Sequence, residues 1–183
     1  MTYPVNTIEA APEAAKPILT AAQKGFGFVP NLLAVMSTAP ALLEGYMTLS
    51  RIFDSASLNA TERQIVLLAA SRENGCAYCM SVHTALAGMQ KVPADVIDAI
   101  RGDRAIADPK LQALRVFAAE VTRTRGWPED GATKAFLAAG YGPQQVLEVI
   151  LGVGLKTMSN YTTHIAGTPL DAAFKPVEWS DAA

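Results

Sequence analysis

The chain has 183 residues, of which 50% are hydrophobic and only 17% are charged, and its formal net charge is -2. This length fits one domain with a substantial core, and the near-neutral charge favours neither nucleic acid nor an anionic membrane as a partner. Because few charges are available to cover the surface, we expect part of the apolar surface to be buried in a homo-oligomer.

No apolar run approaches the roughly 18 residues that span a bilayer, and the first twelve residues lack the basic start and apolar middle of a signal peptide. We therefore expect a cytoplasmic protein with no membrane partner. In a reducing cytosol, two cysteines close in sequence are more often catalytic or metal-binding than a structural disulfide.

Apolar residues recur at intervals of three and four along almost the whole chain, which is typical of helices, and no strand pattern is present. The chain is therefore predicted to be all-α. Helices are expected at 7–25, 30–36, 40–54, about 59–74, 76–89, 93–101, 108–125, 129–139 and 143–166. Asn59 or Thr61 is expected to cap the fourth of these, and Asn74-Gly75 to end it.

No low-complexity linker divides the chain, so a single domain is expected over residues 1–183. Its core part is placed at 58–140, a helical N-terminal part at 1–57, the final helix at 143–166 and an extended tail at 168–183.

The only two cysteines, Cys76 and Cys79, are followed by His83 in the segment CAYCMSVH. On a helix, positions i, i+3 and i+7 lie on one face, and residues four apart are neighbours. The spacing therefore predicts a thiol pair with a base beside it, which favours redox chemistry without a metal, flavin or nucleotide cofactor.

The two cysteines differ in what would activate them. The expected helix start at Cys76 favours a thiolate there, because a helix N-terminus stabilises negative charge. Cys79 lies beside His83, which can accept its proton. We take Cys79 as the attacking thiol and Cys76 as the resolving thiol, with the reverse order as the alternative.

Two other interpretations of the cysteines stay open. They are small hydrophobic core residues in one, and zinc ligands completed by His83 and His164 in the other. A thioredoxin-like domain is disfavoured because no βαβ pattern is visible.

The segment LNATERQIVLLAASRENGCAYCMSVH at 58–83 resembles the carboxymuconolactone decarboxylase/AhpD-like superfamily, above all its peroxidase-related branch around alkylhydroperoxidase D. The resemblance is strong over 59–88 and looser over 27–31 and the final helix. It implies an orthogonal bundle of about eight helices that assembles as a trimer or hexamer.

The resemblance also implies a dithiol peroxidase, with Cys76 and Cys79 as the redox pair and His83 in a proton relay. The family relay includes a glutamate twelve residues before the first cysteine, and that position is Gln64 here. An amide can hold a hydrogen-bond network together but cannot carry the proton.

Glu62 and Glu73 are the nearby acids that are candidates to replace that glutamate. Glu62 is expected to face away and to be solvated, because it lies about half a turn from Gln64. Glu73 is a weaker candidate site residue that could fold back on the start of the Cys76 helix, where its charge would raise a thiol pKa.

The predicted function is reduction of a small organic hydroperoxide, with an external dithiol or disulfide-reductase system as electron donor. Tyr78 and Met80 are expected to be packing residues in an apolar setting, and His164 a satisfied interior or interface histidine. The alternatives are a redox-sensing oligomer, a general disulfide reductase and a lactone-acting enzyme of the decarboxylase type. For the last of these, Arg51 and Arg72 are surface residues rather than a dedicated carboxylate site.

Overall fold

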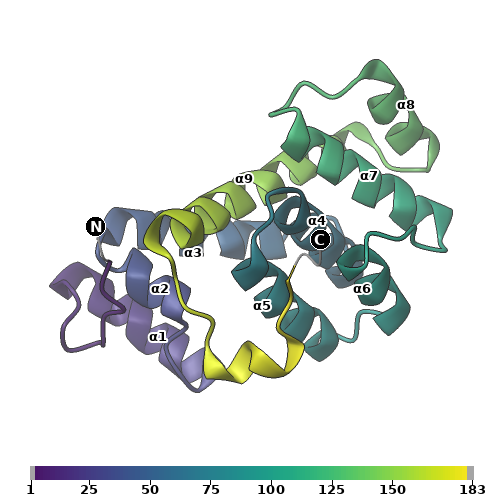
Figure 1. Cartoon of the computed structure of the whole chain (residues 1–183). Coiled ribbons are helices and arrows are strands. Elements are labelled where there is room, and N and C mark those ends of the chain that lie inside the picture. Colours follow the sequence, from purple (N-terminus) through teal and green to yellow (C-terminus); the bar gives the residue numbers. More distant parts are fainter. Residues whose placement is uncertain (1–2, 181–183) are drawn as a thin grey trace.

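A computed structural model describes residues 3–180, and over that range the chain forms nine α-helices, two short 3₁₀-helices and no strand (Figure 1). The all-α prediction is confirmed. Residues 1–2 and 181–183 of the predicted N-terminal part and tail lie outside the described residues. The elements are η1 (Glu13–Ala15), α1 (Lys16–Phe26), α2 (Asn31–Met36), α3 (Pro40–Asp54), α4 (Ala60–Glu73), α5 (Ala77–Met89), α6 (Ala94–Arg101), α7 (Pro109–Arg123), α8 (Asp130–Ala138), α9 (Pro143–Ala166) and η2 (Ala172–Val177).

The two ends of the chain differ from the predicted helix boundaries. The first helix was expected from residue 7, but α1 begins at Lys16, after a turn and η1. Pro17 then lies in the first helical turn, where a residue without an N–H is tolerated. The tail was expected to be extended, yet it contains η2.

Helix α4 is the centre of the bundle and packs against α3, α5, α6, α7 and α9. Its start is fixed by a capping box in which the Asn59 side chain accepts from the Glu62 N–H and the Glu62 carboxylate accepts from the Asn59 N–H. Of the two predicted caps, Asn59 is therefore the one used. Nine of the fourteen residues of α4 are buried, so it carries no single apolar face.

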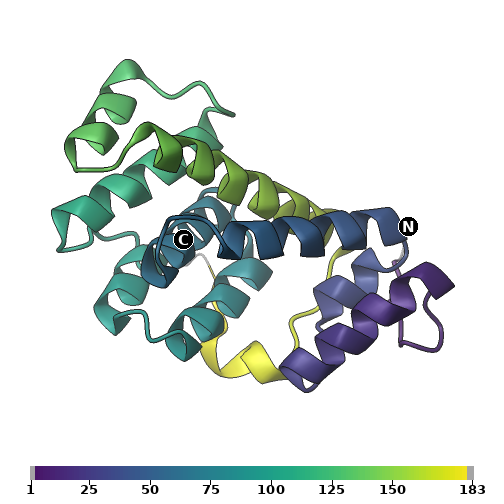
Figure 2. The same cartoon turned by 180° about the vertical axis from the view of Figure 1, so that it is seen from behind.

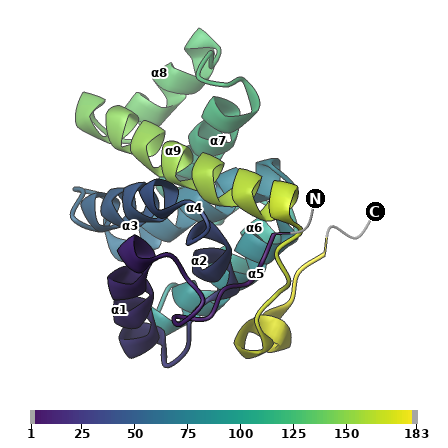
Figure 3. The ribbon, with the colours of Figure 1, turned by 90° about the vertical axis from the view of Figure 1, so that its left-hand side faces the viewer.

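Helix α9 crosses α3 and α4, and Figures 2 and 3 show the three helices from behind and from the side. The close approach depends on Gly152. A Cβ atom there would lie 2.7 Å from a Val66 methyl carbon and 2.8 Å from the Phe53 ring. The C-terminal half of α9, which lies beyond Gly152, thereby packs against α5.

The segment after α9 returns along α2 to α5, and it is drawn in yellow in Figure 1. Asp171 accepts hydrogen bonds from the Asn31 N–H at 2.8 Å and the Tyr78 hydroxyl at 2.7 Å. Further on, the Trp179 N–H donates to the Ser81 hydroxyl at 2.9 Å. The tail is thus fastened to α5 at two points. Among the described helices, none is both long and apolar enough to cross a membrane.

Candidate active site

The thiol pair lies where α4 turns into α5. Gly75 adopts a left-handed φ of 64°, and the Cys76 N–H donates to the Ser71 carbonyl at 2.9 Å. Cys76 thereby becomes the N-cap of α5, and Cys79 lies in its first turn. Both thiols are unpaired, and each cysteine is 1% exposed. The predicted helix start beside Cys76 is confirmed.

A buried polar stripe on α9 faces the thiols. It consists of Lys156, Ser159, Asn160 and Thr163, which occupy positions i, i+3, i+4 and i+7 of the helix and are all buried. The Thr163 hydroxyl lies 3.1 Å from Cys76 Sγ, and Cys79 Sγ lies 3.8 Å from the Ser159 hydroxyl. The α9 polar stripe therefore forms the second wall of the site.

Asn160 connects the stripe to the end of α4. Its carbonyl oxygen accepts from the Asn74 amide at 2.9 Å, while its own Nδ2 is buried without a hydrogen-bond partner. The Asn160 side chain nevertheless lies close enough to Cys79 to lower the pKa of that thiol. A buried donor of this kind is costly unless negative charge develops beside it, and a Cys79 thiolate would supply that charge.

The surroundings push the two thiol pKa values apart. Burial raises the pKa of Cys79, but the Cys76 thiol, the charge of Lys156 and the Ser159 and Asn160 side chains outweigh it, and the pKa falls below its ordinary value. The pKa of Cys76 is raised, chiefly because its thiol donates to Cys79 and because it is buried. Cys79 is thus the thiol with the lower pKa, and the order of attack between the two thiols stays a prediction.

Lys156 was not predicted as part of the site. Its side chain is 1% exposed, although lysine is rarely buried without a partner. The described ion pairs with aspartate or glutamate involve other side chains. The positive charge of Lys156 instead acts on Cys79 and on His83.

His83 is buried and neutral. Burial and the nearby Lys156 charge hold its pKa well below the usual range. Its Nδ1 lies 3.1 Å from the Gln64 carbonyl oxygen, and the Gln64 amide nitrogen donates to Gln90 at 3.2 Å. Because Gln64 accepts at Nδ1, the Nε2 of His83 is left with the lone pair. None of the described hydrogen bonds joins His83 to a sulfur.

A cavity of about 120 Å³ opens beside His83 and is lined mainly by aromatic and aliphatic side chains. Tyr46 is in its wall, and the pKa of Tyr46 is raised, first by burial and then by the nearby Cys79. Tyr78 also lines the cavity, and its hydroxyl accepts from the Leu32 N–H at 3.1 Å. Tyr78 therefore both packs and shapes the cavity wall, whereas Met80 is fully buried.

The two candidate acids lie elsewhere than the sequence suggested. Glu62 was expected to be solvated, but it is only 8% exposed, because it closes the α4 capping box and accepts from the Tyr141 hydroxyl at 3.0 Å. Glu73 is exposed and lines a different cavity with Arg72 and Arg115. None of the described hydrogen bonds links either carboxylate to the thiols or to His83.

The polar residues near the end of α9 differ in their exposure. Asn160 is buried in the site, whereas Tyr161 and His164 are exposed. Of the two predicted positions for His164, the interior one is wrong, and the interface one stays a prediction. Within residues 3–180, no group of three or more His, Cys, Asp and Glu side chains is arranged to hold a metal ion.

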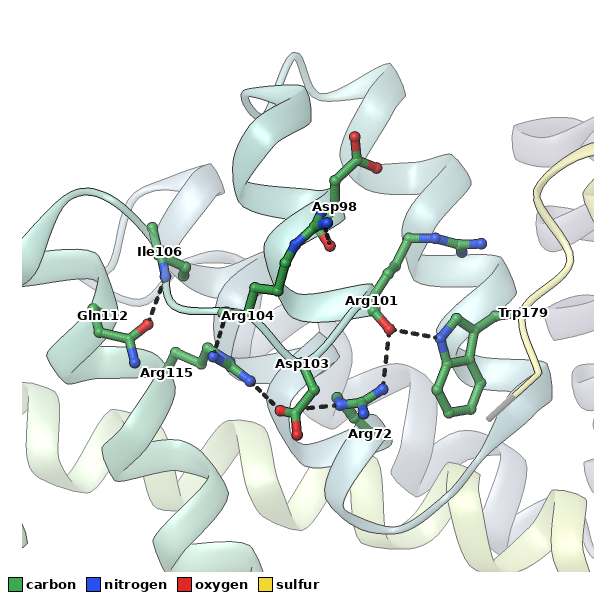
Figure 4. Close-up of polar contacts among 9 residues, drawn as sticks. All are labelled: Arg72, Asp98, Arg101, Asp103, Arg104, Ile106, Gln112, Arg115 and Trp179. Carbon is green, nitrogen blue, oxygen red and sulfur yellow. Dashed lines mark hydrogen bonds and ion pairs between the residues drawn. The ribbon is translucent and has the colours of Figure 1, made fainter. Parts of the chain in front are cut away.

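A second polar region surrounds Asp103, on the loop between α6 and α7 (Figure 4). Its carboxylate lies 2.5 Å from Arg115 and 3.4 Å from Arg72. Arg72 also donates to the Arg101 carbonyl at 3.0 Å and lies over the Trp179 ring at 5.5 Å. These arginines thus hold a loop and the tail in place, next to a cavity of about 190 Å³.

The family model that matches the sequence is that of the carboxymuconolactone decarboxylase family, over residues 40–120. This segment runs from α3 into α7 and includes both cysteines and His83. Residues 40–120 are thus similar in sequence to the carboxymuconolactone decarboxylase family, and the fold is that of AhpD-like proteins. No curated protein matches the sequence.

Several solved structures share the fold over nearly the whole chain. An alkylhydroperoxidase AhpD core, an uncharacterized peroxidase-related protein from Ralstonia eutropha JMP134, has a TM-score of 0.82 and 21% identity and covers 94% of this chain and 93% of its own. A peroxidase-related protein from Silicibacter sp. TM1040 has a TM-score of 0.80 and 18% identity, with 95% and 92% covered. The debrominase Bmp8, as a cysteine-to-alanine variant in complex with 2,3,4-tribromopyrrole, has a TM-score of 0.81 and 16% identity, with 97% and 95% covered.

Proposed function

We propose that this protein is a thiol-dependent reductase of small organic hydroperoxides that works through a Cys76–Cys79 dithiol/disulfide cycle. The observation that carries the proposal is the buried dithiol itself, with one thiol poised to ionise, one poised to stay protonated, and an apolar cavity alongside. The fold shared with peroxidase-related proteins supports the same chemistry.

In the first step, the Cys79 thiolate attacks the outer oxygen of the hydroperoxide, which breaks the O–O bond. Cys79 becomes a sulfenic acid, and the alkoxide leaves. The alkoxide takes the proton of the Cys76 thiol and departs as the alcohol. Tyr46 and His83 line the cavity from which the substrate would approach, and the neutral Nε2 of His83 can accept a hydrogen bond from the hydroperoxide O–H.

In the second step, the Cys76 thiolate attacks the Cys79 sulfenic acid and displaces hydroxide, which gives the intramolecular disulfide. An external dithiol or disulfide-reductase system then reduces it by exchange. The cycle needs no metal or organic cofactor. Gln64 orients His83 and holds its Nδ1 proton but cannot relay a proton itself.

We further propose that the protein acts in the cytoplasm as a homo-oligomer, a trimer or hexamer. Exposed apolar side chains on α9 support an oligomer. They are Leu147, Ile150, Tyr161 and Ile165.

A second candidate function is reductive dehalogenation of a small aromatic compound. The structural similarity to a debrominase and the aromatic lining of the cavity favour it. Here Cys79 would take the halogen as a sulfenyl halide while the ring gains a proton, and Cys76 would displace halide to give the same disulfide.

The test is a count of free thiols in the reduced protein before and after one equivalent of cumene hydroperoxide, beside a parallel sample with 2,3,4-tribromopyrrole. Rapid loss of both thiols, with a mass decrease of about two hydrogens, is expected with the hydroperoxide. Loss with the bromopyrrole alone would favour the second function. Thiols that persist with both compounds would contradict both and leave a disulfide reductase, a redox sensor or a lactone-acting enzyme to be tested.

A further inference from the structure

Lys156 is a positive charge enclosed in the protein, and no carboxylate within residues 3–180 pairs with it. Its side chain is 1% exposed in the middle of α9, and no hydrogen bond or ion pair to an acidic side chain is described for it. Enclosing an unpaired ammonium carries a large free-energy cost. A fold that keeps a lysine here therefore needs an anion close to it.

The groups around Lys156 include one that can become that anion. On α5, the charge of Lys156 acts on Cys79 and on the neutral His83. Cys76 and, on α3, Tyr46 are neighbours of Cys79. Asp54, at the end of α3, acts on Tyr46 but is exposed and lies 3.9 Å from Arg63. No carboxylate of α2, α4 or α7, the other helices packed on α9, has a described contact with this group.

The Cys79 sulfur is the best placed of these groups. It lies against Ser159, one turn along α9 from Lys156 on the same stripe, and beside the unpartnered Nδ2 of Asn160. Cys76 instead contacts Thr163, two turns from Lys156. The Lys156 ammonium and the Asn160 amide are each costly to bury alone. Both lie near the Cys79 sulfur.

We propose that Lys156 is the counter-ion of a Cys79 thiolate in the reduced protein and is the residue that activates this thiol. Its consequence for turnover rests on the proposed function, whereas the ion pair does not. Gln64 cannot accept a proton and His83 is held neutral. Charge stabilisation by Lys156 therefore replaces removal of the proton by a relay acid.

The same ion pair has a redox consequence. When Cys79 enters a disulfide, its negative charge disappears and Lys156 is left buried without a counter-ion. The oxidised protein is therefore disfavoured relative to the reduced protein, which makes the disulfide more oxidising than it would be without the lysine.

The first experiment compares Cys76→Ser with Cys76→Ser/Lys156→Met and measures iodoacetamide alkylation and thiolate absorbance across pH. Methionine keeps the length of the side chain and removes the charge. We expect the alkylation rate of Cys79 at about pH 6 to fall at least about tenfold and its titration to move up by at least about one pH unit. Lys134→Met, at an exposed position on α8, is the matched control and should change neither.

The second experiment equilibrates the dithiol protein with a reference dithiol and compares wild type with Lys156→Met. The equilibrium constant for disulfide formation should rise at least about tenfold, equivalent to a potential about 30 mV lower. If Lys156→Met does not fold, Lys156→Gln, which keeps a polar side chain, serves in both measurements. A folded variant with unchanged Cys79 ionisation and potential would overturn the proposal.

These readouts need no peroxide, so the two proposals can fail separately. If Lys156→Met shifts the ionisation while wild type does not consume hydroperoxide, the ion pair stands and the peroxidase assignment falls. If wild type consumes hydroperoxide and Lys156→Met ionises Cys79 like wild type, the peroxidase assignment stands and the ion pair falls.

Discussion

Two regions of the molecule hold positive charge in opposite ways. At Asp103, two arginines converge on a carboxylate that is itself largely exposed (Figure 4). They also donate to the carbonyl groups of Arg101, at the end of α6, and Arg104, in the loop that follows. At the thiol site, Lys156 is enclosed on α9, none of its described contacts is with an acidic side chain, and its charge acts on Cys79.

The difference distinguishes charge that stabilises the fold, at Asp103, from charge that alters the reactivity of a thiol, at Lys156. A paired surface cluster ties segments together and is worth little energy for each pair. A buried charge without a carboxylate is expensive and is retained only where something else balances it. The comparison therefore predicts that changes at the thiol site alter reactivity, whereas changes around Asp103 alter stability alone.

The largest effect is expected for the cysteines. Cys79→Ser and Cys76→Ser should each lower hydroperoxide turnover at least about 100-fold, because each thiol forms a bond in the cycle. Circular dichroism should show that the helical fold remains. A dimedone trap for sulfenic acid should label Cys76→Ser after one equivalent of hydroperoxide but not Cys79→Ser. Labelling of Cys79→Ser alone would reverse the assigned order of attack.

The next effect belongs to the structural region. Trp179→Ala should lower the free energy of unfolding by about 3 kcal/mol or more, because a buried indole that packs against Arg72 is lost. Urea denaturation measures it. Trp127, which is 86% exposed, provides the matched control, and Trp127→Ala should change stability by less than about 0.5 kcal/mol. The Cys79 alkylation rate of folded Trp179→Ala should equal that of wild type.

His83 should make the fold sensitive to mild acid. Burial and Lys156 hold its pKa well below the usual value in the folded state, so between that pKa and about 6.5 only the unfolded chain binds the proton. The contribution to stability is fully present above about pH 6.5 and is lost as the pH falls, by about 1.4 kcal/mol for each pH unit.

Thermal unfolding of His83→Gln across pH 5 to 8 tests this, since the variant should lack that part of the slope. The chain has only one other histidine, His164, which is exposed. His164→Gln is therefore the control and should keep the slope of wild type. Equal slopes for wild type and His83→Gln would show that His83 is not held neutral.

A smaller effect is expected when the family relay acid is restored. Gln64→Glu places a carboxylate at the Nδ1 of His83, which makes that histidine a stronger base. Because the proposed ion pair with Lys156 ionises Cys79 without a relay acid, the hydroperoxide rate at about pH 7 should change by less than about threefold. In Lys156→Met the same substitution should recover part of the lost rate. A tenfold gain in the wild-type background would mean that proton removal limits the reaction.

The parts of this site that follow from the sequence are local. Asn59, Gly75 and the Cys76–His83 spacing act within one or two turns, so capping and helical periodicity predict where they lie. Glu62 was placed wrongly because its partner Tyr141 comes from a distant part of the chain and brings it into the interior. Burial of that kind depends on tertiary packing.

Lys156 was missed for a related reason. A charged residue in a helix is normally solvated, and only the packing of α9 on α5 shows that this one is not. A signal was nevertheless present. Polar residues at 156, 159, 160 and 163 share one face of an otherwise apolar helix, which is the helical spacing expected of a buried polar stripe.

The smallest effect, and the sharpest test of the comparison, is Asp103→Asn. The two arginines hold the pKa of Asp103 below its usual range, Arg72 most strongly, so its contribution to stability is present above about pH 4 and is lost as the pH falls through the folded-state pKa. Because the carboxylate is 65% exposed, solvent screens both pairs, and the loss at neutral pH should stay below about 1 kcal/mol. Chemical denaturation at about pH 7 and pH 3 measures both expectations.

Cys79 alkylation should be unchanged in Asp103→Asn, because the charge of Asp103 is satisfied locally. A shift in Cys79 reactivity would show instead that the two regions are coupled through Arg72 and the end of α4.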